Sequence, residues 1–189
     1  MATKRDKFFG GTGELQETVV ATNRTVKVVK GGRRFSISAL VVVGDRRGRV
    51  GIGYGKATDT PLAIEKAVAE AGKNLKQISL KGDTIPHEVI GHFGAAQVYM
   101  RPAGHGTGVI AGSGVRAVCQ MVGIRNILTK SLGSNNAVNL VKAVMNGLER
   151  LKDAKEVSRL RGVPLEELVP ALAAESEPAE AEADKGQAT

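Results

Sequence analysis

Five arginines lie in or beside two predicted turns of a β-rich segment near the start of this 189-residue chain. Arg33 and Arg34 follow a pair of glycines, whereas Arg46, Arg47 and Arg49 surround the next turn. A guanidinium group binds phosphate oxygens in a planar, bidentate geometry, so arginine suits the capture of a polyanion. A stiff sheet with arginines at its turns therefore favours RNA or DNA as the partner over a small substrate.

The charge distribution agrees with a nucleic-acid partner. The chain has a net charge of +8, and residues 1–56 alone carry 12 Lys and Arg against 4 Asp and Glu. Residues 57–170 carry 14 against 10, and residues 171–189 carry 1 against 5. The acidic tail thus offsets a strongly basic remainder, whose field attracts nucleic acid or an anionic membrane. The membrane is the weaker interpretation, because no basic amphipathic helix with large apolar anchors accompanies the charge.

The segments that hold these arginines are predicted as three strands and a helix. Thr18–Lys30 and Phe35–Val43 are rich in β-branched residues. Arg49–Tyr54 forms the third strand, and its alternate glycines indicate close approach of another backbone or a bulge. A helix begins near Pro61. Its apolar positions at helical spacing are Ile64, Ala67, Val68, Ala71, Leu75 and Ile78.

The rest of the chain predicts a second α+β unit, with a boundary near residues 82–86. It contains strands over 95–101 and 124–128, a helix over 115–122, and a helix capped at Asn135–Asn136. The predicted organisation is an α+β chain with a basic flexible arm (1–12), a β-β-β-α domain (13–80), a second α+β domain (84–152), a short helical extension (153–170) and an acidic disordered tail (171–189).

Catalysis is not expected from this sequence. Between Val89 and Leu148 there is no Asp or Glu, and general acid–base chemistry and Mg²⁺ binding depend on carboxylates. The spacing of His87, His92 and His105 fits no helical or β-ribbon metal site. The single cysteine, Cys119, cannot form an internal disulfide and is expected on a buried helix face. We predict no enzymatic activity, no metal, no cofactor and no small-molecule substrate.

Two glycine-rich segments match nucleotide-binding loops only in part. A phosphate loop ending at Lys56 would need glycine where Val50 stands and Ser or Thr where Ala57 stands. Residues 106–111 fit the loose dinucleotide pattern, but no acidic residue follows about 20 positions later. These glycines are expected to permit close packing and a sharp entry to the next helix. An alternative is that the amides at that helix N-terminus hold an RNA phosphate.

The aromatic content narrows the kind of nucleic acid. There is no tryptophan, and only Phe35 and Tyr54 lie in the basic sheet region. Single-strand binders stack successive bases on aromatic side chains, and no such platform is predicted here. Folded, double-stranded RNA recognised through its backbone and shape fits better.

Four segments closely resemble the bacterial small-subunit ribosomal protein S-five family. They read VKGGRRFSISALVVVGDRRGRVGIGYGKA, TPLAIEKAVAEA, GTGVIAGSGVRAV and TKSLGSNNAVNLVKAV, and the likeness runs from about Gly13 to Leu168. The resemblance implies a first domain similar to the double-stranded-RNA-binding fold. It also implies a cytoplasmic, non-enzymatic constituent of the small ribosomal subunit that binds its rRNA, stabilises the head and body region, contributes to translational accuracy, lines the messenger RNA entry path and touches ribosomal proteins S-four and S-eight.

The predicted rRNA contacts combine the charge argument with this resemblance. They are Lys27, Lys30, Gly31, Gly32, Arg33, Arg34, Arg46, Arg47, Arg49 and Lys56. The sequence is also compatible with two other functions. One is a free-standing regulator that binds double-stranded RNA, and the other is a small-molecule kinase that holds ATP in the loop Gly104–Gly114. Against the kinase, the sequence around this loop lacks the carboxylates that would bind magnesium.

Overall fold

The computed structural model describes residues 15–163, and those up to Leu151 belong to one compact unit. The chain from Lys152 onward forms a separate unit, in which α4 (Ala154–Arg161) is a short helix. This helix falls within the predicted helical extension. The predicted basic arm, the acidic tail and residues 164–170 of the extension lie outside the described residues.

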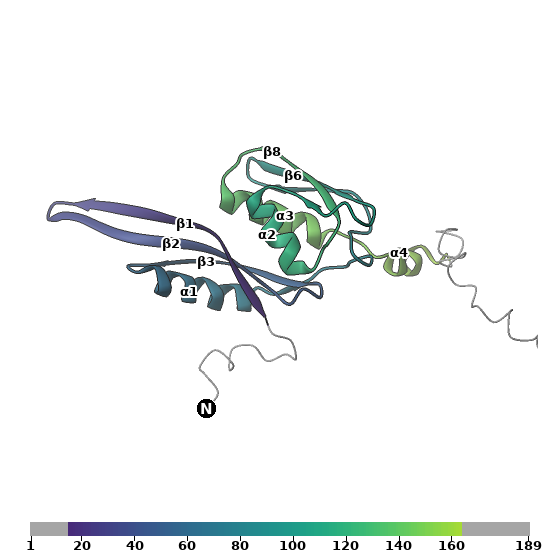
Figure 1. Ribbon diagram of the computed structural model, residues 1–189, viewed down its shortest axis with the longest axis horizontal. Coiled ribbons are helices and arrows are strands. Elements are labelled where there is room, and N and C mark those ends of the chain that lie inside the picture. Colours follow the sequence, from purple (N-terminus) through teal and green to yellow (C-terminus); the bar gives the residue numbers. More distant parts are fainter. Residues whose placement is uncertain (1–14, 164–189) are drawn as a thin grey trace, which may run out of the picture. The chain divides into compact units, whose positions relative to one another are not determined.

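The first sheet and its helix have the predicted β-β-β-α order (Figure 1). Strands β1 (Gln16–Val29), β2 (Gly32–Gly44) and β3 (Arg49–Ala57) pair antiparallel, and a two-residue strand β4 (Lys76–Gln77) adds to β3. Helix α1 (Thr60–Lys73) begins with proline in its first turn. The helix ends earlier than its apolar pattern predicted, so Leu75 and Ile78 lie beyond it. Ile78 is nevertheless buried, in the core on the other side of the sheet.

Helix α1 packs against β3 with almost no side chain between the two backbones. Gly51, Gly53 and Gly55 point toward the helix, where a Cβ atom at each would collide with a helix carbonyl oxygen. The helix residues that they face are Ala71, Ala67 and Ala63, all fully buried. The alternating glycines of β3 therefore mark close backbone approach, as predicted, because no larger residue fits there.

The second sheet has the order β5-β6-β8-β7, covered on one face by two helices (Figure 1). Strands β5 (Val89–Phe93), β6 (Ala96–Pro102) and β8 (Ile127–Gly133) are antiparallel, and β7 (Val109–Ile110) runs parallel to β8. The helices are α2 (Ser113–Val122) and α3 (Ala137–Glu149), and the Asn136 side chain caps α3 by accepting from the Val138 N–H at 3.0 Å.

Three details of this sheet differ from the sequence prediction. No strand was predicted at β5, where Gly91 weakens the β pattern, or at the two-residue β7, and β8 starts three residues later than expected. Gly91 is required because a Cβ there would meet the Ala143 carbonyl of α3. Glycine is thus required within this strand because the strand lies in close contact with a helix. Local β propensity cannot reveal such a contact.

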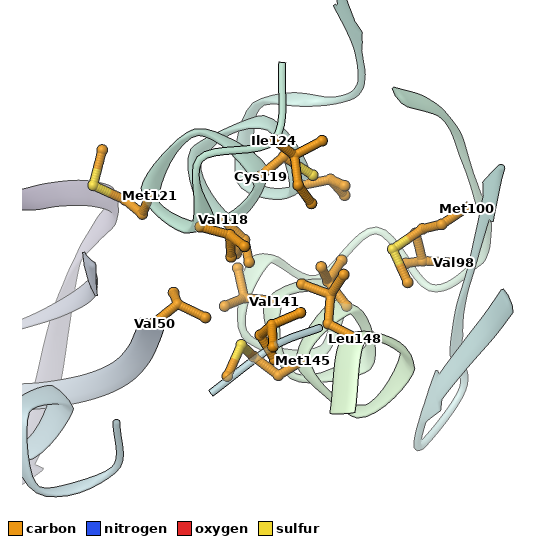
Figure 2. Packing of buried hydrophobic residues seen from close by; sticks show 14 of the residues in the cluster. Val50, Val98, Met100, Val118, Cys119, Met121, Ile124, Val141, Met145 and Leu148 are labelled. Carbon is orange, nitrogen blue, oxygen red and sulfur yellow. The ribbon is translucent and has the colours of Figure 1, made fainter. Parts of the chain in front are cut away.

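A single buried cluster joins the first sheet to helices α2 and α3. Val50 of β3 faces Met121 of α2 and Val141 of α3 across this cluster, as Figure 2 shows. The second half of β2 is buried on both faces, because Ala39, Val41 and Val43 pack on α1 whereas Leu40 and Val42 enter the shared cluster. The division at residues 82–86 stays a prediction, and the apolar core continues across it.

Candidate nucleic-acid interface

The predicted contact residues of the first turn lie on a two-stranded arm formed by β1 and β2. Pairing of β2 with β3 begins at Ile37, whereas pairing of β2 with β1 continues out to Gly32. The last five residues of the arm therefore extend about 16 Å beyond the three-stranded part of the sheet. Lys30 and Gly31 form the turn, and Gly32 has a φ of 126°, which favours glycine.

One face of this arm, which we call the basic face, carries paired cations. Lys27 and Arg34 are direct cross-strand partners, and both side chains are exposed. Lys56 lies on the same face nearer the body of the sheet, where it pairs with Ser38. Like charges directly opposite each other destabilise a two-stranded ribbon. A partner with negative charge would relieve this repulsion.

The opposite face of the arm, the helix-side face, has a different chemistry. Arg33 lies here, because neighbouring strand residues point to opposite faces. The Arg24 guanidinium lies 4.1 Å from the centroid of the Phe35 ring, an arrangement in which the cation is attracted to the ring face. Val28 beside them is 73 % exposed and Val26 is 47 % exposed. The sequence prediction did not include Arg24, which the register of β1 on β2 places on the face of Arg33.

The electrostatics of the arm are one-sided. From Thr18 to Gly44 the chain contains five Lys and Arg residues and no Asp or Glu. Among residues 15–163, none of these five cations forms an ion pair with a carboxylate. Their charge is therefore directed to solvent, where it attracts an anionic partner.

The second arginine-rich turn lies at the other end of the sheet and has a different environment. The 13 residues of β2 separate the two turns, and the twelve steps from its first residue to its last correspond to about 40 Å. Asp45 holds this turn: its carboxylate accepts from the Arg47 N–H at 2.7 Å and pairs with the Arg49 guanidinium at 3.3 Å. The Arg46 N–H donates to the Met121 carbonyl of α2 at 3.0 Å, and Arg46 itself has a φ of 56°.

The predicted contact residues are thus divided between two regions. The arm brings together Lys27, Lys30, Gly31, Gly32, Arg33 and Arg34, with Lys56 at its base. Arg46, Arg47 and Arg49 surround a turn whose backbone joins the first sheet to α2. That turn has a structural role in holding the two layers together, and its exposed side chains stay a predicted contact.

The glycine-rich loop lacks the geometry of a dinucleotide site. Gly106 and Gly108 have positive φ and form a turn, after which the chain enters β7. The Gly108 N–H donates to the Asn126 side chain at 3.0 Å. The pattern at 106–111 therefore spans a turn and a strand, and α2 begins only at Ser113. In a dinucleotide loop the glycines lead directly into the helix.

The described part of the chain offers little for other classes of function. Within residues 15–163, no group of three His, Cys, Asp or Glu side chains is placed to hold a metal ion. None of the helices in that range combines the length and the apolar character needed to span a bilayer. Cys119 is buried on α2, as predicted, and this burial raises the pKa of its thiol to about 12.

Comparison with known proteins identifies the class of protein to which this fold and this basic arm belong. The family model "Ribosomal protein S5, N-terminal domain" matches residues 15–79, and "Ribosomal protein S5, C-terminal domain" matches residues 91–161. Together they cover most of the chain, which belongs to the ribosomal protein S5 family, a family of structural, non-enzymatic proteins.

A particular relative supports the same assignment. The chain is 48 % identical over 158 residues to the small ribosomal subunit protein uS5 of Psychromonas ingrahamii, and the match covers 84 % of this chain and 95 % of the relative. The predicted resemblance to the S-five family is therefore confirmed.

Proposed function

We propose that this protein is a structural constituent of the small ribosomal subunit and binds small-subunit rRNA through the β1–β2 arm. The observation that carries the proposal is the charge of the arm: five cations that form no ion pair among residues 15–163, no carboxylate between Thr18 and Gly44, and the opposed pair Lys27 and Arg34. Membership of the ribosomal protein S5 family supports a partner of this kind.

The arm suits a folded RNA because of its width and its charges. A two-stranded ribbon is thin, and Gly31 and Gly32 leave open space at its turn, with nothing within 4 Å of a Cβ at either position. The backbone of the turn can therefore approach a phosphate chain closely, while Lys27 and Arg34 bind phosphate oxygens from one face. Contacts of this kind read the shape and the backbone of an RNA helix.

The finer parts of the proposal come from the family. They are stabilisation of the head and body region, a contribution to translational accuracy, a position along the messenger RNA entry path, and contacts with ribosomal proteins S-four and S-eight. The alternative is a free-standing regulator that binds double-stranded RNA. Sedimentation distinguishes them, because a ribosomal constituent stays with salt-washed small subunits at about one copy each, whereas a regulator does not.

The direct test replaces Arg33 and Arg34 by alanine and measures binding to a small-subunit rRNA transcript over a range of salt concentrations. Each lost phosphate contact reduces the slope of log affinity against log salt by about 1. The double variant should therefore lose about 1 through Arg34 on the basic face, and about 2 where Arg33 on the opposite face also contacts a phosphate. The double variant Lys66→Ala with Lys73→Ala, on the exposed side of α1, makes the same change in net charge and should leave the slope unchanged. Equal slopes for the arginine variant and the wild-type protein would refute the arm as a contact.

A further inference from the structure

A hollow of about 320 Å³ lies between the two layers, away from the arm. One wall comes from the first sheet and the residues after α1, including Ile52 and Asn74, and the other comes from β5 and α3. Its volume is at the lower end of the range for small-ligand sites. The hollow is open to solvent and has room for one small group, such as a single unit of a polymer.

The floor of the hollow is apolar and includes an aromatic ring. Ile52 and Met145 line it, together with Phe93, which is 42 % exposed. A phenyl ring that is left partly exposed beside two aliphatic side chains provides a flat apolar surface. Flat π-systems stack favourably on such a surface.

Two lysines lie beside this apolar floor. The Lys142 ammonium lies 4.9 Å from the centroid of the Phe93 ring and has no carboxylate partner within residues 15–163. The Lys76 ammonium pairs with Glu149 at 2.7 Å. An ammonium has three N–H donors, so Lys76 keeps donors for a second oxygen acceptor. The cations of the hollow exceed its single carboxylate by one.

Amide groups complete the lining. Asn74 and Asn146 both line the hollow. The Asn146 side-chain oxygen accepts from the His92 N–H at 3.5 Å, and an amide NH₂ group has two donors of its own.

We propose that this hollow binds one unpaired nucleotide of the RNA partner. The base lies against Phe93, Ile52 and Met145 and takes the place of the Lys142 ammonium over the Phe93 ring. The polar edge of the base meets the asparagine amides, and Lys142 and Lys76 hold the phosphate. A nucleotide is the only common unit of a biological polyanion that combines a flat π-system, a hydrogen-bonding edge and a strong negative charge. Unstacked bases of folded RNA are recognised in this way on aromatic side chains. The inference rests on the proposed function.

The test uses the full chain, labelled with ¹⁵N, and a titration with uridine and adenosine 5′-monophosphates followed by NMR. The backbone amides of Asn74, Phe93 and Asn146 should shift together and saturate. Uridine, which lacks the phosphate, and ribose 5-phosphate, which lacks the base, should each bind about tenfold more weakly, because each loses one set of contacts. Equal affinities for ribose 5-phosphate and the nucleotides would mean that the hollow binds only the phosphate group, and this result would overturn the proposal.

A peptide partner is tested in the same titration. Tetraglutamate that shifts these amides as strongly as the nucleotides would favour an acidic protein segment and overturn the nucleotide assignment. Absence of any shift in these amides with the nucleotides would also overturn it.

Two variants separate the contributions of the cation and the ring. Lys142→Gln should weaken mononucleotide binding about tenfold, and Phe93→Leu should weaken it while sparing ribose 5-phosphate. Lys73→Gln, which removes an exposed lysine of α1 outside the hollow, is the matched control and should change nothing. Wild-type nucleotide affinity in both Lys142→Gln and Phe93→Leu would refute the assignment.

The failure of this inference and the failure of the proposed function give different results. The Arg33→Ala and Arg34→Ala double variant should bind rRNA more weakly and retain the mononucleotide titration. A protein that binds rRNA through the arm but shows no nucleotide response at the hollow refutes only the inference. A protein that does not bind rRNA at all refutes the proposed function as well.

Discussion

The packing of α1 on β3 makes Gly53→Ala a direct test of the fold. A methyl group at this position would overlap the Ala67 carbonyl oxygen and lie 2.7 Å from the Ala71 nitrogen. Both are main-chain atoms of the helix, so no side chain can rotate away to make room. Gly53 is not among the residues with positive φ, and the cost is therefore steric.

The expected magnitude follows from the contact. An extra methyl group in a packed core costs about 1–3 kcal/mol. We expect about 3 kcal/mol here, because the helix as a whole must move away from the strand. In a chain of this size, 1 kcal/mol corresponds to about 2–4 °C in Tm, so the variant should unfold about 6–12 °C below the wild-type protein.

Thermal unfolding of the full chain, followed by circular dichroism, measures this shift. Gly31→Ala is the matched control, because nothing lies within 4 Å of its Cβ and its φ is not positive. That control should keep the wild-type Tm or raise it slightly. Adding Ala67→Gly to Gly53→Ala should bring no recovery, since the overlap is with the carbonyl. A wild-type Tm for Gly53→Ala would refute the close contact, and recovery with Ala67→Gly would refute its main-chain origin.

Two further predictions concern single side chains. Lys27→Glu converts the like-charge pair with Arg34 into an attractive one. The free energy of unfolding of the free protein, measured by chemical denaturation, should rise by about 0.2–1 kcal/mol, whereas rRNA binding should weaken. A loss of stability would contradict the pairing of these two residues. Cys119, whose pKa is raised to about 12 by burial, should resist thiol reagents at pH 8 until the protein unfolds. Because the folded-state pKa is the higher one, its contribution to stability is complete below about pH 9 and is lost as pH rises toward 12; rapid labelling of native protein would contradict this burial.

The first sheet was predictable because its signals are local. Runs of β-branched residues indicate strands, paired glycines indicate a reversal, and Pro61 indicates the start of a helix. Each of these signals depends only on residues that are close together in the sequence. The alternate glycines of β3 also indicated close backbone approach correctly. They could not indicate which element approaches, because Ala63, Ala67 and Ala71 are typical of many helices.

The second sheet was harder to predict because its signals depend on distant contacts. Strand β5 contains Gly91, a weak strand former, and that glycine is selected by the Ala143 carbonyl of α3. Strand β7 has two residues and exists because it pairs with β8. Leu75 and Ile78 continue the helical spacing of α1, but both lie beyond the end of the helix, and Ile78 packs in the core shared by both layers.

The sequence by itself determined the chemical nature of the candidate interface: many cations, few carboxylates, few aromatic residues and two turns rich in arginine. Only the tertiary structure decided how those groups are arranged. It placed Arg33 and Arg34 on opposite faces, separated the two turns by the length of β2, and assigned the backbone at Arg46 to a contact with α2. The physical reason is that charge and propensity belong to single residues, whereas facing, distance and enclosure depend on strand pairing and on packing between segments far apart in the chain.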